Sequence, residues 1–556
     1  MAGPSRYSPE MLAEYRRHWN APTFSGYWDL NAQIYPEQEA LVDARVRLTW
    51  SQLKQMMDRL ALGLLEMGME RDQVLVLQLP NWVELYLMRM ACEKAGIMSL
   101  PALRTFRHHE MEYMCRHVEA AGVVIPWEFG GRDYYQMVRD IQPGLPSLKH
   151  ILVVGNRVPP GTISVWDMME RPLEQQFPPD HLESRRYRPD DIILTTTSGS
   201  TGLPKVVEQP MGARLMYIRI TNETLGMSSG DTVASFSPVA SGPNSLVFIR
   251  CPVAGAKGVL LETFSAEEAL ELVQRERVTV MGLVPAMLVM LVEHPNFSRY
   301  DLSSLRVIFC AAAPFPYEQM LEVQKRMPCP IVYGYGALDL GGGIMSSPQD
   351  PDAVRLGTVG KPHTAFTFKI VDEGGREVPS GEAGELLGSG PGCASGYYRD
   401  PETTGAAWST EGWFRTGDLA RWDDQGHLMI VGRKKEMIIR GGQNIYPIEL
   451  ENLLAAHPKV ARVAVVGMPD PVLGERACAF IVPRGSQVFD FEEMVAYLRG
   501  QDLASFKLPE RLEIRESLPH LSEVNKVDKR SLRQEIAQML EDEAHSRPRS
   551  RGPSRK

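Results

Sequence analysis

The chain has 556 residues, of which 44% are hydrophobic and 23% are charged, and its formal net charge is −9. Such a length exceeds one ordinary hydrophobic core, so we expect two or more domains. The acidic balance excludes a broad basic surface for nucleic acid, and no apolar run approaches the length of a membrane span. The seven cysteines form no CxxC pair, which favours a reducing, cytoplasmic compartment and indicates no metal site. No secretory signal is visible at the amino terminus.

Helices and strands alternate along the first part of the chain. Apolar residues at helical spacing predict a helix at 49–67, and the apolar run 74–79 predicts a buried strand. Further helices are expected at 83–94, 109–120 and 266–275. Further strands are expected at 98–102, 123–125, 233–236, 258–261, 278–281, 307–310 and 331–333. Strands that alternate with helices of this length predict doubly wound parallel sheets, here in two successive α/β halves.

The pattern changes twice in the second part. From about 355, short strands and Gly/Pro turns predict a small β-rich subdomain. Near 432 the pattern breaks again, and the following helices and strands suffice for a small α+β domain with its own core. The predicted elements there are helices at 447–456 and 491–499 and strands at 463–466 and 477–482. We therefore predict an N-terminal domain at 1–432, a C-terminal domain at 433–540 and a disordered basic tail at 541–556.

A stretch rich in hydroxyl residues and glycine follows the apolar run 192–194. It reads TTTSGSTGLPK from Thr195 to Lys205. Glycines let the backbone turn so that its N–H groups point into the loop, hydroxyls add donors, and Lys205 adds a positive charge. Such a loop can surround a triphosphate, although it is not a Walker A loop because no Ser or Thr follows the lysine. A flexible linker is the alternative on composition alone.

The SGSTGxPK spacing of this loop resembles the phosphate loop of the adenylate-forming superfamily, which includes acyl-CoA synthetases, aryl acid–AMP ligases and luciferases. The resemblance spans most of the chain, to Leu532, and is closest in pattern to dihydroxybenzoate–AMP ligase-like enzymes. It implies a large N-terminal domain of two doubly wound α/β subdomains plus a small β-rich subdomain, followed by a small mobile α+β C-terminal domain. It also implies ATP and Mg²⁺ as cofactors and Lys205 as a catalytic residue. The implied nucleotide-binding residues of the loop are Thr197, Ser198, Gly199, Ser200, Thr201 and Gly202.

Two further stretches resemble family motifs around the adenine and the acid. The sequence YGYGALD, which ends at Asp339, resembles the YGxTE motif. The resemblance implies that Tyr335 stacks on adenine, that Gly336 borders the acyl pocket and that Asp339 binds Mg²⁺, directly or through water. Leu338 and Asp339 depart from the usual Thr and Glu. On the residues alone, a buried strand with a tight turn is the favoured explanation of the stretch.

The sequence CAAAP at 310–314 resembles the family's small-residue loop between adenine and the acyl pocket. The resemblance places Ala312 at the nucleotide and Ala311 at the acid. Small side chains there let a flat ring approach the backbone closely. A strand end that happens to be lined with alanines fits the composition equally well.

The sequence GWFRTGDL at 412–419 matches the family's W(Y/F)xTGD motif, which implies that Asp418 binds ribose. A carboxylate suits this role because each of its oxygens accepts a hydrogen bond from one of the two hydroxyls.

The segment from Gly432 to Asn444 resembles the hinge and thiol channel of the family. It implies that Arg433 contacts ribose or phosphate and that Lys435 is the hinge. Gly441 and Gly442 would let a slender pantetheine arm pass. Considered alone, the segment would be interpreted as a basic solvated loop.

Lys526 lies in a polar loop just before a predicted helix, where a lone lysine is usually a solvated surface charge. The stretch nevertheless resembles the family's terminal segment, in which one lysine joins the carboxylate to the α-phosphate. This resemblance implies that Lys526 is catalytic. Asn525 replaces the glycine that normally precedes it, and Asn also tolerates positive φ.

The sequence says less about the identity of the carboxylic acid substrate. Relatives carry a histidine in the loop that corresponds to 237–244, whereas this loop reads SPVASGPN. Ser241 and Asn244 are candidate ligands of a ring hydroxyl, and a Pro/Gly turn is the alternative. Small residues near Ala311 favour a compact aryl or alicyclic ring over a long chain.

We consider two functions. The first is an ATP-dependent acid–thiol ligase that makes an acyl-AMP with release of pyrophosphate and passes the acyl group to CoA or to a phosphopantetheine carrier protein. Its partners are then a small-molecule carboxylic acid and, for the second acceptor, an acyl or aryl carrier protein. The second function is a non-catalytic relative that acts as a sensor or scaffold, which only Leu338 and Asp339 favour. A monomer and a homodimer both remain open.

Overall fold

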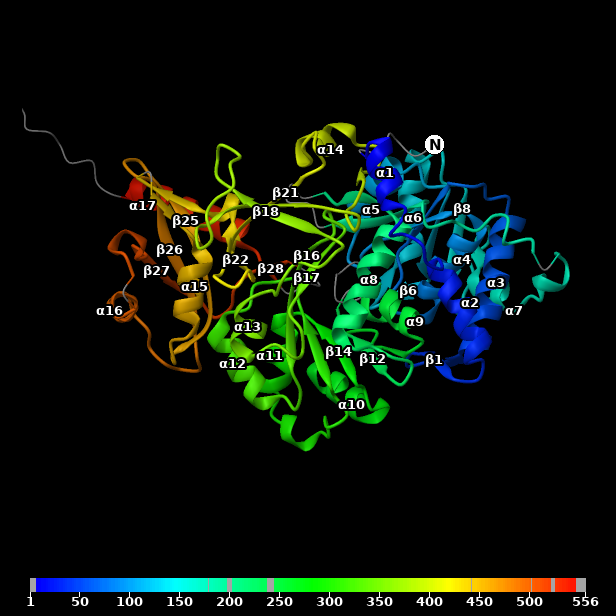
Figure 1. Cartoon of the computed structure of the whole chain (residues 1–556), viewed down its shortest axis with the longest axis horizontal. Helices are drawn as coiled ribbons and strands as arrows, with labels where there is room; N and C mark the ends of the chain where they lie inside the picture. The colour runs from blue at the N-terminus through cyan, green and yellow to red at the C-terminus, as the bar shows by residue number, and fades with distance from the viewer. Residues whose placement is uncertain are drawn as a thin grey trace, which may run out of the picture.

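The computed structural model describes residues 7–178, 180–197, 203–237, 245–441, 443–501, 503–521 and 526–546, and the side chains at 521, 526 and 544–546 lie outside that description. A large N-terminal domain and a small C-terminal domain make up the molecule, with the small domain (orange and red) on the left of Figure 1. None of the helices in the described ranges combines the length and hydropathy of a membrane span.

The first α/β unit contains a five-stranded parallel sheet in the order β4-β3-β5-β8-β9. Its strands are β3 (Val74–Leu77), β4 (Met98–Pro101), β5 (Gly122–Pro126), β8 (His150–Val154) and β9 (Ile163–Ser164). Its helices include α3 (Trp50–Glu66), α4 (Val83–Ala95), α5 (His108–His117) and α6 (Tyr134–Ile141). Every residue of α4 is buried, because the sheet, α3 and α2 (Phe24–Ile34) enclose it. The alternation predicted for this part of the chain is confirmed.

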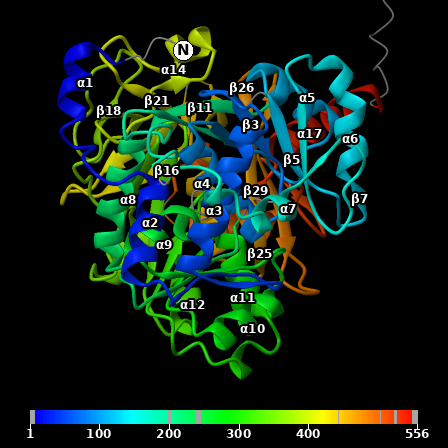
Figure 2. The same cartoon turned by 90° about the vertical axis from the view of Figure 1, so that its right-hand side faces the viewer.

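The second α/β unit contains an eight-stranded sheet in the order β17-β16-β15-β14-β12-β13-β1-β2. Its strands are β1 (Glu39–Val42), β2 (Arg47–Thr49), β12 (Thr232–Ser235), β13 (Lys257–Leu260), β14 (Val280–Leu283), β15 (Val307–Cys310), β16 (Ile331–Ala337) and β17 (Gly342–Met345). The central pairs are parallel, and the two edge pairs are antiparallel. Helices α10 (Ala266–Glu276), α11 (Pro285–Glu293) and α12 (Tyr317–Arg326) gather at the lower end of the molecule in both Figure 1 and Figure 2.

One strand of this sheet begins later than the sequence predicts. The strand expected at 278–281 is β14, at 280–283. Val278 still belongs to the end of α10, because its N–H donates to the carbonyl of Val273 over 3.1 Å. Thr279 is held by its hydroxyl, which donates to Asp231 over 2.6 Å. The N–H of Thr279 already donates to the carbonyl of Thr232 beside β12 over 2.8 Å, so the difference from the predicted start comes from the helix cap at Val278.

Besides the short hairpin of β6 (Glu128–Phe129) and β7 (Arg132–Asp133), the large domain contains two small antiparallel sheets. One has the order β10-β11-β20, with β10 (Ile192–Thr197), β11 (Lys205–Pro210) and β20 (Gly396–Tyr397). The other has the order β18-β19-β21-β22, with β18 (Thr367–Val371), β19 (Gly384–Ser389), β21 (Phe414–Trp422) and β22 (Leu428–Arg433). Helix α8 (Met211–Leu225) follows β11 directly. The predicted β-rich subdomain after 355 is confirmed.

The small domain is a five-stranded sheet with helices. Its strands are β23 (Ile438–Arg440), β24 (Gln443–Ile445), β25 (Val460–Asp470), β26 (Gly474–Pro483) and β27 (Arg511–Ile514). Its helices are α15 (Pro447–Ala455), α16 (Phe491–Arg499) and α17 (Lys529–Ser546). Its two apolar clusters draw only on residues from Ile438 onward, whereas the clusters of the large domain end at Ile430. A boundary between 432 and 433 stays a prediction.

The charge of a buried lysine joins three helices of the first α/β unit. Lys94 on α4 is 2% exposed and its ammonium contacts Asp29 of α2 at 2.7 Å and also Asp58 of α3. We predict that Lys94→Met lowers the free energy of unfolding by about 3 kcal/mol, because it leaves two carboxylates without their buried cation. Urea unfolding measures this change. Lys54→Met is the matched control, since Lys54 contacts the same two carboxylates from a half-exposed position and should cost less than about 1 kcal/mol. Equal costs for the two variants would contradict the prediction.

Candidate active site

A buried carboxylate lies where three strands of the large domain meet. Asp418 on β21 is 4% exposed. Its Oδ2 accepts a hydrogen bond from the hydroxyl of Tyr335 on β16 over 2.7 Å. Its Oδ1 lies 2.7 Å from Nε of Arg433, the residue opposite it on β22. A buried carboxylate is stable only when it is paired in this way. The structure therefore brings together three of the residues predicted to contact the nucleotide.

The pairing fixes the protonation of the tyrosine. Burial raises the pKa of Tyr335 well above its ordinary value, and the neighbouring Asp418 raises it further. Tyr335 therefore remains a neutral hydrogen-bond donor. The backbone N–H of Asp418 donates to the hydroxyl of Thr416 over 3.0 Å, which holds the bend at Gly417, where φ is 67°. A left-handed φ of this kind favours glycine.

A second polar group joins Lys205 to Asp339 through a tyrosine. The hydroxyl of Tyr397 on β20 donates to Oδ1 of Asp339 over 2.8 Å. The ammonium of Lys205, the first residue of β11, donates to the same hydroxyl over 3.3 Å and lies 4.5 Å from the centre of the Tyr397 ring. The predicted phosphate lysine and the predicted metal ligand thus share one partner.

The phosphate loop connects the ends of a β-hairpin. Thr197, the last residue of β10, is the register partner of Lys205 on β11. The strand predicted at 192–194 extends to this threonine. The loop residues Ser198, Gly199, Ser200, Thr201 and Gly202 lie outside the described residues, so their contact with phosphate stays a prediction.

The strand predicted at 331–333 is longer than expected, because it continues to Ala337 before the turn. Tyr335 and Gly336 continue β16, which forms an antiparallel hairpin with β17. A Cβ atom at Gly343 of β17 would lie 1.9 Å from the carbonyl oxygen of Tyr335, so only glycine permits this close approach. Ala311 and Ala312 follow the adjacent β15, and Ala312 has a φ of 77°. The small residues predicted around the adenine and the acid therefore lie at the ends of neighbouring strands.

The predicted hinge lies close after Arg433, the arginine predicted to contact the nucleotide. Lys435 lies in a short 3-10 helix at 434–436, and its carbonyl accepts a hydrogen bond from Arg533 of the small domain over 2.9 Å. Burial lowers the pKa of Lys435, and the nearby cations Arg433 and Lys205 lower it further. Gly441 has a φ of 57°. Gly442 lies outside the described residues.

The predicted catalytic lysine begins a short strand of the small domain. Lys526 opens β29 (Lys526–Val527), which pairs with β28 (His520–Leu521). The side chain of Lys526 lies outside the described residues, and so do Ser241 and Asn244 of the predicted acyl pocket. Their roles stay predictions.

One residue of the site was missed at the level of sequence. No role was predicted for Tyr397, yet its hydroxyl links Lys205 to Asp339. Its position immediately after a glycine, on a strand beside the phosphate hairpin, was the available signal. The pairing itself depends on residues 58 and 192 positions away and has no local signature.

Two family models match this chain. The model described as AMP-binding enzyme matches residues 28–398, and the model described as AMP-binding enzyme C-terminal domain matches residues 449–523. The chain belongs to the AMP-binding enzyme family.

Similar proteins cover nearly its whole length. It is 32% identical to the 2,3-dihydroxybenzoate-AMP ligase of Bacillus subtilis, over 96% of this chain and 97% of that protein. It is 31% identical to the 2-hydroxy-7-methoxy-5-methyl-1-naphthoate–CoA ligase of Streptomyces carzinostaticus, over 97% and 98%. The crystal structure of anthranilate CoA ligase AuaEII in complex with anthranoyl-AMP has the same fold, with a TM-score of 0.84 at 23% identity over 93% of this chain and 98% of that one.

The family membership confirms two of the expectations from sequence. The chain is an adenylate-forming enzyme of the acid–thiol ligase class, and its fold is the expected large N-terminal domain followed by a small C-terminal domain. The geometry agrees, because a buried carboxylate, a neutral tyrosine and a group of cations gather at the strand ends.

Substitution of Tyr397 tests the group that it forms with Lys205 and Asp339. We predict that Tyr397→Phe lowers the rate of acyl-adenylate formation about 10-fold, because the loss of one hydroxyl releases both Asp339 and Lys205. Packing of the ring against Trp408, 5.2 Å between ring centres, is retained, so the melting temperature should change little. Single-turnover kinetics with saturating ATP measure the effect. Tyr398→Phe, at the adjacent buried position, is the control and should retain the wild-type rate. Equal rates for Tyr397→Phe and the wild type would contradict the prediction.

Proposed function

We propose that this enzyme activates an aryl or alicyclic carboxylic acid with ATP and transfers the resulting acyl group to the thiol of CoA or of a carrier-protein phosphopantetheine. The observation that carries the proposal is the buried Asp418 carboxylate, held by Tyr335 and Arg433 beside Lys205 and Asp339. The aryl acids named for two of the relatives support the choice of acid.

The nucleotide would bind across the three strand ends. Each oxygen of Asp418 already accepts one hydrogen bond and has a further lone-pair site for a ribose hydroxyl. The ring of Tyr335, anchored by its hydroxyl, offers a flat face to adenine. Ala312 leaves space for the base, and Arg433 and Lys205 supply positive charge for the ribose phosphate and the triphosphate. Lys435 adds to this positive potential, as its lowered pKa indicates.

The donor set suits Mg²⁺ bound together with ATP. Mg²⁺ is commonly held by one or two carboxylates plus substrate phosphates and water. Asp339 supplies such a carboxylate, and its pairing with the Tyr397 hydroxyl leaves its second oxygen available for a ligand or a bridging water. When bound, the ion would neutralise phosphate charge. Direct and water-mediated binding by Asp339 are both compatible with the geometry.

The chemistry requires two displacements. A carboxylate oxygen of the acid attacks the α-phosphorus, the bond to the bridging oxygen breaks, and pyrophosphate leaves. The thiolate then attacks the acyl carbon, and AMP leaves with the bonding electron pair. Lys526 would reduce the repulsion between carboxylate and α-phosphate in the first step. We assign to Lys435 the pivot by which the small domain then withdraws Lys526, so that the segment at Gly441 and Gly442 admits the thiol.

The acid pocket would lie beside the small residues. Ala311 and Gly336 border the ends of β15 and β16, where a compact ring can approach the backbone. Ser241 and Asn244 are the candidate ligands of polar ring substituents. The acceptor of the acyl group is the thiol of CoA or of an aryl carrier protein. A carrier protein would be a protein partner of this enzyme.

Acid-dependent exchange of labelled pyrophosphate into ATP tests the proposal. We expect exchange with at least one acid in a panel of benzoates, hydroxybenzoates, cyclohexane carboxylates and short fatty acids, with rings preferred over chains. Exchange with fatty acids alone would contradict the ring preference. A folded protein that binds ATP and supports no exchange with any of these acids would instead favour the non-catalytic sensor or scaffold.

The role of Lys526 is tested by separating the two half-reactions. Lys526→Ala is predicted to lower the rate of acyl-adenylate formation on the order of 100-fold or more, because it removes a cation from the developing charge. Thioester formation from supplied acyl-AMP should remain within a few-fold of wild type. Lys529→Ala, which removes another lysine of the same segment that contacts Glu451 and Glu436, is the control for a general effect on docking of the small domain. Equal losses in both half-reactions of a folded Lys526→Ala protein would show that the division of roles is wrong.

A further inference from the structure

A fully buried arginine without a carboxylate partner lies behind the predicted acyl pocket. Arg250 is 1% exposed and ends the π-helix η3 (Leu246–Arg250). Its Nη2 donates to the hydroxyl of Tyr217 over 3.4 Å, a long hydrogen bond. Its Nε and Nη1 have no hydrogen-bond partner among the described residues. A guanidinium carries five N–H donors and stays charged, so most of its hydrogen-bonding capacity is unused here.

Other groups around this arginine increase the positive potential. Arg214 of α8 is buried, and its pKa is lowered to about 10 by burial. The pKa of His363 is lowered to about 4 by burial, and Arg250 lowers it further. Nε2 of this histidine has no hydrogen-bond partner in the part of the chain that the structure describes. Two buried cations and a neutral imidazole thus face one another with no acidic side chain among their described contacts.

Arg250 packs against β15 close to the predicted acid site. Its guanidinium lies 5.5 Å from the ring centre of Phe309, which precedes Ala311 on β15 by two residues. A Cβ atom at Gly334 of β16 would lie 2.8 Å from the same ring. Gly334, Gly336 and, across the hairpin, Gly343 share one face, because alternate residues of a strand and their register partners point to the same side. On this face Gly336 and Gly343 carry no side chain, whereas Met345, the register partner of Gly334, and the ring of Phe309 lie beside Gly334.

Leaving a charge buried and unpaired costs several kcal/mol, so such groups are normally paired or bind ligands. We propose that the inner end of the acyl pocket is an anion site built on Arg250 and that the acid substrate carries a second carboxylate. One carboxylate of the substrate reacts at the nucleotide, and the other accepts hydrogen bonds from Nε and Nη1 of Arg250. His363 Nε2 and the Tyr217 hydroxyl lie beside it. This inference rests on the proposed function, because it specifies the acid for the same site.

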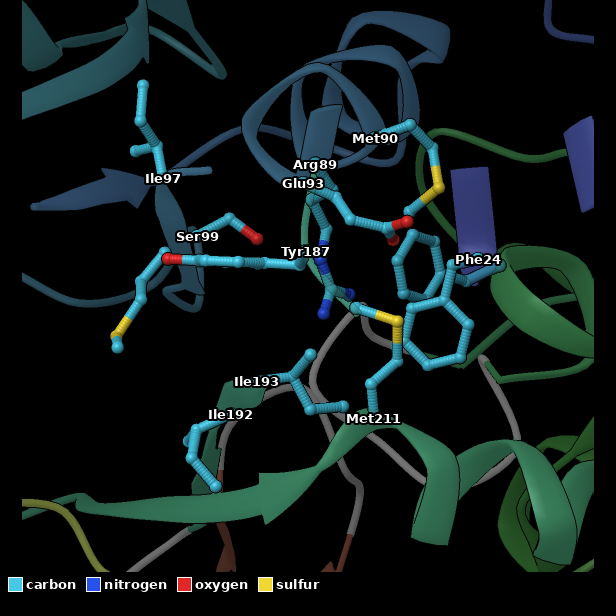
Figure 3. Close-up of a pocket in the computed structure, with 12 residues that line it drawn as sticks. Phe24, Arg89, Met90, Glu93, Ile97, Ser99, Tyr187, Ile192, Ile193 and Met211 are labelled. Atoms are coloured by element: carbon cyan, nitrogen blue, oxygen red, sulfur yellow. The ribbon is translucent and has the colours of Figure 1, made fainter. Parts of the chain in front are cut away.

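A second buried arginine provides a matched control. Arg89 of α4 is 8% exposed, its Nε also has no partner among the described residues, and its guanidinium lies 3.7 Å from the ring centre of Phe248. Figure 3 shows it in a different pocket, together with Glu93 of the same helix and Ile193 of β10. That pocket is lined by none of the residues assigned here to the nucleotide or the acid. Arg89→Met therefore removes an equally buried cation without touching the proposed anion site.

The test compares matched acids in the pyrophosphate exchange reaction. The diacids are benzene-1,4-dicarboxylate, benzene-1,3-dicarboxylate and cyclohexane-1,4-dicarboxylate, and each is paired with its methyl monoester, which retains one reactive carboxylate. We expect kcat/KM for at least one diacid to exceed that of its monoester on the order of 100-fold, because the monoester leaves the cation unpaired. In Arg250→Met this ratio should fall to about 1, whereas Arg89→Met should retain it.

Thermal unfolding supplies a readout that does not depend on catalysis. The favoured diacid alone should raise the melting temperature of the wild type and of Arg89→Met but not that of Arg250→Met. Arg250→Met itself should keep or raise the melting temperature, because it replaces an unpaired buried charge with an apolar side chain.

Several results would overturn the inference. The first is that monoacids and monoesters react as well as every diacid. Arg250 would then bind only water or a solvent ion. Another is a diacid preference that survives Arg250→Met, which would place the second carboxylate elsewhere. Failure of all acids to support exchange would contradict the proposed function, whereas exchange with monoacids and no diacid preference contradicts this inference alone.

Discussion

The arrangement of the site depends on the burial of one carboxylate. Asp418 is removed from water and shared between a tyrosine hydroxyl and an arginine, so strands β16, β21 and β22 are fixed relative to one another at their ends. Breaking either contact would leave a buried charge short of partners, which costs more than the contact itself gains. The same residues that stabilise this junction present a carboxylate, an aromatic face and a guanidinium to the solvent side. The residues proposed to recognise the nucleotide are therefore the same ones that stabilise this junction.

Positive charge is distributed around the predicted ligands with few counter-ions. Lys205 contacts a tyrosine hydroxyl and ring, and Lys435 lies close enough to Lys205 and Arg433 for its pKa to be lowered. Such repulsion among cations is relieved when a polyanion binds, which suits ATP. The same reasoning leads to Arg250 at the opposite end of the acyl pocket, where two donor atoms have no partner among the described residues. A ligand with anionic groups at both ends would satisfy both sites. Positive charge therefore contributes to the organisation of the site as much as shape does.

Local patterns predicted much of this structure, and long-range pairings did not follow from them. Hydrophobic periodicity located α3, α10 and α16 to within about a residue, and short glycine motifs pointed to Lys205, Asp339 and Asp418, because these features depend on neighbours in the chain. The roles of Tyr397 and Arg250 could not be predicted in this way. The first joins residues from three distant segments, and the second is defined by the absence of an acidic neighbour in three dimensions.

The central claim is that Asp418 holds the ribose of the nucleotide. The most direct measurement compares the dissociation constants of ATP and 2′,3′-dideoxy-ATP for the wild type and for Asp418→Asn by titration calorimetry. The account predicts that the wild type binds ATP at least about 10-fold more tightly than the dideoxy analogue and that Asp418→Asn binds the two nearly equally. A folded Asp418→Asn protein that retained the full discrimination against the dideoxy nucleotide would contradict the account.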